Sequence, residues 1–183
     1  MRSRFTPGLK SDSSPAGLQT GTPRYHILDM LRLPLLLLAL ALFAAAQKYD
    51  GPRPPKPDLP YLKHADTLVP TEAAQATERK QKNDTLYTVQ GAGSSARTPL
   101  ASPTFLFQAD KFVADKLGLY RLEVKGGHRE ILFNAKKPPK SFRVDVTHLD
   151  GNLYKIEVGD SLAPGEYSLS PEGSNQVFCF AVF

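Results

Sequence analysis

Apolar and polar residues alternate with a period of two from Thr104 to the end of the 183-residue chain. Such alternation indicates antiparallel strands that each turn one face toward a core, with Gly, Asn, Pro and Asp marking the turns. The predicted strands cover residues 104–108, 119–124, 130–134, 141–149, 153–158, 166–170 and 176–183, with an earlier candidate at 86–90. The pattern predicts an all-β domain, either a small antiparallel β-sandwich or an open barrel.

The first of two informative turns lies at 126–127. A two-residue loop there places Leu122 opposite Ile131. The same register places Tyr120 opposite Phe133, so one face is apolar on both strands. This hairpin is internally consistent.

The second turn lies at 150–152 and needs a different loop length. A three-residue loop pairs Val146 with Ile156, whereas a two-residue loop would mix apolar and polar residues on each face. We therefore expect a bulged turn with a left-handed residue at Gly151 or Asn152.

The last strand is apolar on both faces, which indicates that both are covered. One face carries three large residues, Phe178, Phe180 and Val182. The other carries Val177, Cys179, Ala181 and Phe183. We expect the face with Cys179 and Ala181 to be an interaction face, covered by Tyr61 and Leu62 of an upstream arm or by a partner protein.

The longest apolar run, residues 33–46, is too short to span a bilayer comfortably and follows Arg32. Small residues at Ala44 and Ala46 suit a signal peptidase, and cleavage would leave Gln47 as the mature N-terminus. Residues 30–46 are thus predicted to be a signal peptide. The alternative is an uncleaved anchor through the same residues.

The segments on either side of this run lack a predicted core. Residues 1–29 are expected to be a disordered leader or the product of a mis-assigned start, with Met30 as the true one. Residues 47–82 are rich in proline and predict an extended arm, with a short exposed helix as an option after Pro70. The β domain is placed at 83–183, with its core at 103–183.

The net charge of +5 is misleading, because residues 1–46 hold five of the 23 lysine and arginine residues and two of the 18 acidic ones. The remainder is nearly neutral, and no nucleic-acid partner is predicted. The cluster KKPPK at 136–140, with Arg143, is compatible with an anionic glycan or a lipid headgroup, although a solvated loop is the simpler interpretation.

The segment LAPGEYSL at 162–169 has a turn followed by Tyr167 near the start of a strand. It resembles the entry to a late strand of immunoglobulin-like and fibronectin-type sandwiches, where such a tyrosine helps to close a corner. Cys179 is the single cysteine, and the chain has no tryptophan. The resemblance therefore implies sandwich architecture only.

No residues show catalytic or metal-ligand spacing, and no cofactor is predicted. His64, His128 and His148 lie in separate segments, His148 opposite Tyr154. Cys179 stands between two phenylalanines, which is typical of a small core residue.

These features predict an exported, non-catalytic cell-envelope protein whose β domain binds or scaffolds an envelope protein or a glycan. It would meet the membrane only during export. One alternative is a small periplasmic hydrolase or metal-dependent enzyme that uses His128 and His148 with nearby carboxylates. Another is an assembly subunit that adds a strand to a neighbouring sheet.

Overall fold

The computed structural model describes residues 48–183, which belong to one compact unit, Gln47–Phe183. Its only helix is a single 3₁₀ turn at Ala114–Lys116, so within these residues no helix is long and apolar enough to cross a bilayer. The strands are β1 Tyr61–His64, β2 Thr67–Pro70, β3 Glu72–Gln75, β4 Thr77–Gln81, β5 Asp84–Gln90, β6 Arg97–Thr98, β7 Thr104–Gln108, β8 Leu117–Lys125, β9 His128–Asn134, β10 Ser141–Phe142, β11 Val144–Asp150, β12 Leu153–Val158, β13 Gly165–Pro171 and β14 Gln176–Val182.

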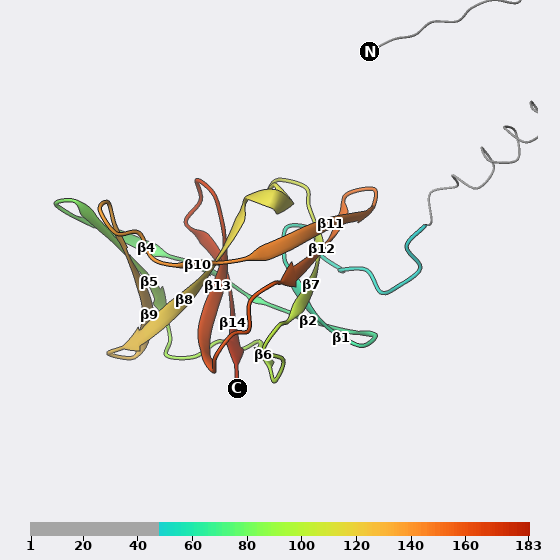
Figure 1. Ribbon diagram of the computed structural model, residues 1–183, viewed down its shortest axis with the longest axis horizontal. Coiled ribbons are helices and arrows are strands. Elements are labelled where there is room, and N and C mark those ends of the chain that lie inside the picture. Colours follow the sequence, from blue (N-terminus) through green and yellow to red (C-terminus); the bar gives the residue numbers. More distant parts are fainter. Residues whose placement is uncertain (1–47) are drawn as a thin grey trace, which may run out of the picture. The chain divides into compact units, whose positions relative to one another are not determined.

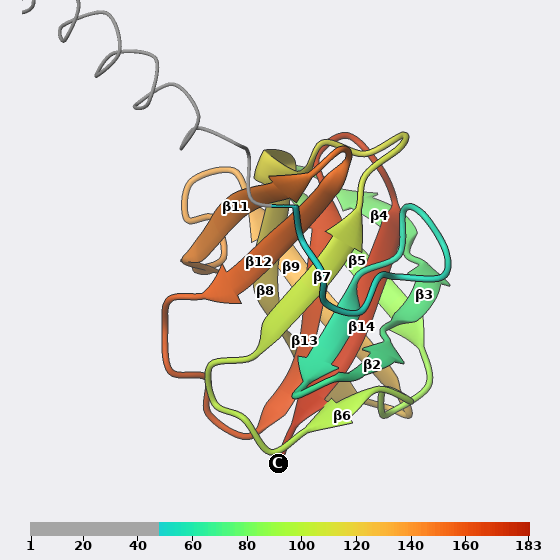
Figure 2. The same cartoon turned by 90° about the vertical axis from the view of Figure 1, so that its right-hand side faces the viewer.

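The strands form two sheets (Figures 1 and 2). The smaller has five strands in the order β11-β12-β7-β1-β2. The larger has nine, with the path β3-β14-β13-β8-β9-β5-β4, while β10 joins β8 and β6 joins β14. All pairings are antiparallel except that of β6 with β14. The all-β prediction is confirmed.

The main core fills the space between the two sheets. The five-stranded sheet contributes Leu62, Phe105 and Ile156, and the larger sheet contributes Tyr167 and Phe180. All five are completely buried. The rings of Phe105 and Phe180 meet edge to face with centroids 5.1 Å apart. This contact joins the sheets as a sandwich.

The larger sheet also curves back on itself as a half-barrel. Its two edge strands, β3 and β4, are separated in the chain only by Ala76. The backbone N–H of Ala76 donates to Asn175 O over 2.8 Å. The edges therefore approach each other at Ala76. A second apolar cluster lies inside the curve, made of Ala76, Val89, Leu122, Val177 and Cys179.

The hairpin at Gly126 and Gly127 has the predicted two-residue turn, but the predicted pairs of Leu122 with Ile131 and Tyr120 with Phe133 lie beyond its short ladder. β8 pairs with β9 from Lys125 and His128 to Glu123 and Glu130. β9 pairs with β5 along its whole length, and the remaining part of β8, from Leu122 back to Leu117, pairs with β13. The strands diverge there.

The predicted bulged turn is also confirmed. Val146 pairs with Ile156, and the register shifts between His148 and Asp150. Gly151 takes the left-handed conformation at φ 58°. Glycine adopts this conformation without the steric cost of a Cβ.

The predicted strand 141–149 is in fact two strands in different sheets. β10 pairs with β8, whereas β11 pairs with β12. They are separated at Arg143, whose N–H donates to Asp160 Oδ2 over 2.8 Å instead of to a strand. The apolar pattern continues across this break because both pieces face the same core.

The later part of the predicted arm, 47–82, lies within the sheets from Tyr61 onward. β1 and β2 belong to the smaller sheet, and β3 and β4 to the larger one. The optional helix after Pro70 is not formed, because β3 pairs with β14 and β4 pairs with β5. A short alanine-rich helix would be marginally stable because it has little apolar surface to pack. As strands, the same residues form ladder hydrogen bonds with their neighbours. The leader and signal residues, 1–46, lie outside the described residues.

The corner predicted at Tyr167 is present. The hydroxyl of Tyr167 donates to Ala163 O over 2.7 Å, four residues upstream. The ring is fully buried and stacks on Phe180. This is the local arrangement that the resemblance to sandwich domains implied.

Candidate functional site

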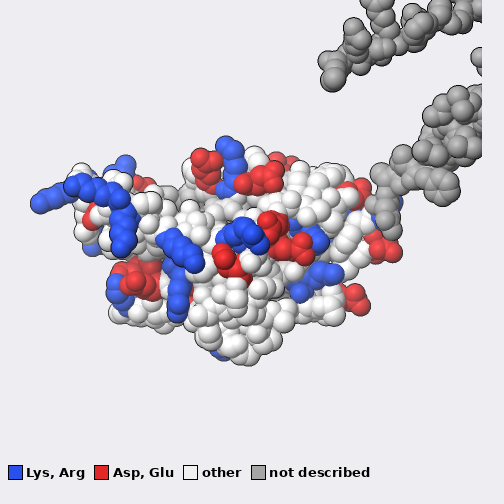
Figure 3. All heavy atoms as spheres, viewed as in Figure 1, with Lys and Arg blue, Asp and Glu red and all other residues white. Residues whose placement is uncertain are grey.

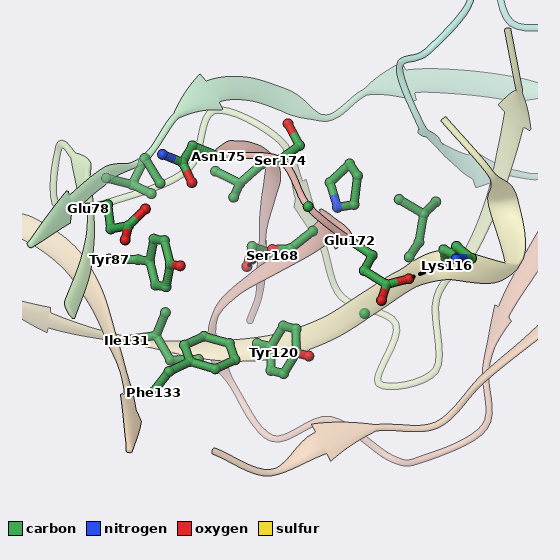
Figure 4. A pocket seen from close by; sticks show the side chains of 18 of the residues that line it. Glu78, Tyr87, Lys116, Tyr120, Ile131, Phe133, Ser168, Glu172, Ser174 and Asn175 are labelled. Atoms are coloured by element: carbon green, nitrogen blue, oxygen red, sulfur yellow. Dashed lines mark hydrogen bonds and ion pairs between the residues drawn. The ribbon is translucent and has the colours of Figure 1, made fainter. Parts of the chain in front are cut away.

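An open cavity of about 720 Å³ lies at one end of the half-barrel (Figure 4). Its wall comes from alternate residues of β5, β8, β9 and β13 and from the turn between β13 and β14. Because successive side chains of a strand point to opposite faces, one residue in two turns into the curve. The period-two pattern of these strands therefore serves both the core and the cavity.

Three aromatic rings line one side of the cavity. Phe133 of β9 lies between Tyr87 of β5 and Tyr120 of β8, with ring centroids 5.5 Å and 5.2 Å away. Both contacts are edge to face. The three rings are only partly buried, so they present apolar surface to the cavity.

The opposite side carries several uncharged polar groups (Figure 4). Ser168 and Ser170 follow each other on one face of β13, with hydroxyl oxygens 3.2 Å apart. Ser174 and Asn175 belong to the turn before β14. Hydroxyl and amide groups can both donate and accept hydrogen bonds.

Charged residues occur at the rim of the cavity. Lys116 Nζ pairs with Glu172 Oε2 over 3.1 Å, and both side chains are well exposed. Glu78 lines the opposite end of the cavity and lies 3.5 Å from Lys80 Nζ. An exposed pair of this kind adds little stability. Because these charged side chains lie at the edge, the cavity has a charged rim around an interior of apolar and uncharged polar groups.

The floor of the cavity is formed by residues of the second apolar cluster, among them Leu122 and Val177, and Cys179 belongs to the same cluster without lining the cavity. Cys179 is fully buried. Burial raises the pKa of its thiol to about 12, although nearby Arg129 acts in the opposite direction. The thiol is therefore neutral at physiological pH and is a core group, not a nucleophile.

Arg129 of β9 closes the curved sheet beyond this floor and has no exposed surface. Its Nη2 donates to Glu72 Oε1 over 2.6 Å and to Gln90 O over 2.7 Å. Its Nη1 donates to Ser94 Oγ over 2.7 Å and more weakly to Glu72 Oε2, and its Nε donates to Gly91 O over 3.0 Å. These bonds use all five N–H groups of the guanidinium.

Two carboxylates balance the charge of Arg129. Burial acts to lower the pKa of Arg129, but the hydrogen bonds to Glu72 and the nearby charges of Glu72 and Glu166 together outweigh it and raise this pKa. Glu166 Oε2 lies 3.8 Å from Nη1 and accepts hydrogen bonds from the backbone and hydroxyl of Ser94. The loop at 91–96 is thereby attached to the closed end of the half-barrel.

The interaction face expected from the sequence is not assembled as predicted. Leu62 packs in the main core with Phe180, and Tyr61 is also buried. Cys179 lies in the second cluster, on the other side of β14. Ala181 is buried too. The Cys179 face is covered by the curved sheet itself, because β5 and β9 bend back over it. Ala44, Ala46 and Gln47 lie outside the described residues.

The three histidines of the described chain have separate partners. His64 Nε2 lies 3.0 Å from Thr98 Oγ1. His128 lies 3.2 Å from Glu130 on the larger sheet. His148 bonds to Gly151 O and packs edge to face on Tyr154 in the smaller sheet, as its predicted pairing required. Within residues 48–183 no three His, Cys, Asp or Glu side chains are grouped as a metal site.

Sequence reasoning missed Arg129 and the aromatic rings of the cavity as a group. Arg129 follows His128 at the start of a strand, where a charged residue is expected to be exposed. The sequence does place Arg129 on the same face of the strand as Ile131 and Phe133, because residues two apart on a strand share a face. This face is recognised as an inner, buried one only once the sheet is known to curve.

The comparisons with known proteins add no relationship. The chain matches no protein-family model, no curated protein and no solved structure.

Proposed function

We propose that this chain is an exported, non-catalytic binding protein of the cell envelope, and that its ligand occupies the cavity of the half-barrel. The observation that carries the proposal is the cavity itself, with aromatic rings on one side and serine and asparagine groups on the other. Binding sites for small molecules are commonly concave and mainly apolar, with a few directed polar groups.

The lining favours an uncharged ligand with one flat apolar face. Such a face would pack on Tyr87, Tyr120 and Phe133. Hydroxyl or amide groups on the other side of the ligand would bond to Ser170 and Asn175. The buried thiol and the fully bonded Arg129 supply no reactive group to the cavity, which favours binding over catalysis.

A fluorescent probe can test the cavity. Residues 47–183 would be titrated with N-phenyl-1-naphthylamine, an uncharged aromatic dye whose fluorescence rises in apolar surroundings. We expect saturable binding. Ser170→Phe places a ring inside the cavity and should raise the dye Kd by at least about tenfold, a loss of about 1.4 kcal/mol.

Ser161→Phe is the matched control, because Ser161 is exposed and lies outside the cavity. This variant should bind the dye like the parent. Equal weakening by both substitutions, or no saturable binding to the parent, would refute a ligand site in the cavity.

Export is tested separately by N-terminal sequencing of the protein recovered outside the cytoplasm. Cleavage by a signal peptidase should leave Gln47 as the first residue. A recovered chain that still carries residues 33–46 would contradict the proposed signal peptide and favour the anchor.

A further inference from the structure

Six lysine and arginine residues gather where the hairpin of β4 and β5 lies beside the loop after β9 (Figure 1). All six are exposed. We call this group the basic tip: Arg79, Lys80, Lys82, Lys136, Lys137 and Lys140. Figure 3 shows basic side chains at the end of the domain where β4, β5 and β9 lie in Figure 1.

Asn134 holds the two parts of the tip together. Its Nδ2 donates to Asp84 Oδ1 over 2.7 Å, which connects β9 to the start of β5. Its Oδ1 accepts the backbone N–H groups of Lys136 and Lys137 over 2.8 Å and 2.9 Å. The side chain of Asn134 therefore orders the lysine loop and attaches it to the hairpin. Basic segments about fifty residues apart become one surface.

The positive charge of the tip is poorly balanced. Two acidic residues, Glu78 and Asp84, lie within the hairpin. Among the described residues, Lys80 is the one tip side chain within 4.0 Å of a carboxylate, that of Glu78 at 3.5 Å. The rest of the domain after residue 46 holds 12 lysine and arginine residues and 14 acidic ones. The excess positive charge is thus concentrated at the tip.

Exposed apolar residues accompany these charges. Leu132 is 46% exposed and pairs with Leu86 on the outer face of β9 and β5. Pro138 and Pro139 separate the lysines of the loop. Lysines beside a membrane are attracted to anionic headgroups, while neighbouring aliphatic groups can enter the boundary with the acyl chains. A soluble polyanion would not use the aliphatic groups.

We propose that the basic tip docks the domain onto a membrane surface that carries anionic lipid headgroups. The cavity residues Glu78, Thr85 and Phe133 lie within a few positions of the tip on the same strands. Docking therefore brings that end of the cavity toward the bilayer. The proposal does not depend on the identity of the cavity ligand.

Vesicle flotation tests this proposal on residues 47–183, which contain both apolar clusters. We expect binding to vesicles of phosphatidylcholine with phosphatidylglycerol, weak binding to phosphatidylcholine alone, and release by high salt. The triple variant Lys82→Glu, Lys136→Glu, Lys137→Glu should lower the partition coefficient by at least about tenfold.

The control reverses three exposed lysines outside the tip, with Lys48→Glu, Lys56→Glu and Lys111→Glu. It makes the same change in net charge but should retain much more binding than the tip variant. Equal loss in the two variants, or no binding of the parent to anionic vesicles, overturns the proposal. Retention on dextran sulfate without vesicle binding also overturns it and assigns the tip to a glycan. Thermal unfolding verifies that both triple variants are folded. If one of them is not, a variant with Lys→Gln at the same three positions is used in its place.

A second readout locates the contact. Pro138→Cys would be labelled with a polarity-sensitive fluorophore, since Cys179 is buried and its thiol is neutral. Anionic vesicles should shift the emission to shorter wavelength. Vesicle binding without such a shift would place the contact elsewhere and overturn the assignment to the tip.

Discussion

Arg129 Nη2 lies 2.6 Å from Glu72 Oε1, although β9 and β3 are not neighbours in the larger sheet. The ion pair crosses the interior of the curve. Arg129 also donates hydrogen bonds to Gln90 O, Gly91 O and Ser94 Oγ, at the start of and within loop 91–96. One buried side chain therefore connects two distant strands and a glycine-rich loop.

Replacement of Arg129 by Met should destabilise the domain strongly. Glu72 and Glu166 would lose their shared cation, and loop 91–96 would lose its hydrogen bonds. Removing one partner of a buried ion pair typically costs about 3–5 kcal/mol. Urea unfolding should show this loss. Arg79→Met, on the exposed surface, should change the free energy of unfolding by less than about 0.5 kcal/mol. Similar effects of the two substitutions would refute a special role for Arg129.

Asp58 should make stability depend on pH in the acid range. Its carboxylate accepts backbone hydrogen bonds from Asp110, Lys111 and Phe112 over 2.9, 2.9 and 3.2 Å. Burial acts to raise the pKa of Asp58, but these three bonds and the positive charge of Lys111 together outweigh it and leave the pKa below its usual value of 3.8. Because the native pKa is the lower one, the carboxylate adds stability above the unfolded pKa. That contribution is lost as pH falls through the native pKa.

Asp58→Asn tests this contribution and tolerates the left-handed backbone at φ 56°. The variant should be less stable by about 1 kcal/mol at neutral pH, and the difference should shrink below the native pKa. Asp66→Asn, in an exposed turn, should match the parent throughout. A difference for Asp58→Asn that is independent of pH would contradict the role of the carboxylate.

Cys179 should resist thiol reagents in the folded protein. With a pKa of about 12, little thiolate exists at pH 8, and the side chain has no exposed surface. Labelling by a chromogenic disulfide should be slower than in urea by a factor on the order of 1,000. Ser141→Cys adds an exposed thiol that should label quickly. Rapid reaction of Cys179 itself would contradict the closed floor of the cavity.

Loss of the Tyr167 hydroxyl should weaken the corner without changing the fold. Tyr167→Phe removes the hydrogen bond to Ala163 O and leaves the buried ring without its anchor in the turn. The expected loss is about 1 kcal/mol in thermal or urea unfolding. Tyr154→Phe, at a half-buried ring on β12, provides the matched control. An equal loss in both variants would show that the corner bond is not important.

Local sequence patterns predicted several elements accurately. Residues 104–108 and 153–158 form strands with the predicted bounds, as β7 and β12. The bulge at Gly151 followed from the pairing of Val146 with Ile156. Tyr167 and its turn predicted the corner. These features depend on neighbouring residues and on the alternation of side chains along a strand, so they are readable from the sequence.

The half-barrel depends on contacts between distant residues. The segment around Ala76 was expected to be an arm or helix because its side chains are short and polar. It becomes two strands because β14 and β5 offer unpaired backbone groups on either side of it. The inward position of Arg129 and the gathering of the basic tip follow from this closure.

The sequence by itself determined that the chain forms antiparallel strands, the approximate bounds of most of the longer strands after residue 83, and which faces are apolar. The tertiary structure decided how the sheet curves, that Cys179 lies beneath it, and that Tyr87, Tyr120 and Phe133 share a cavity. The physical reason is that alternation assigns each side chain to a face, whereas the partner of that face is chosen by packing across the whole domain.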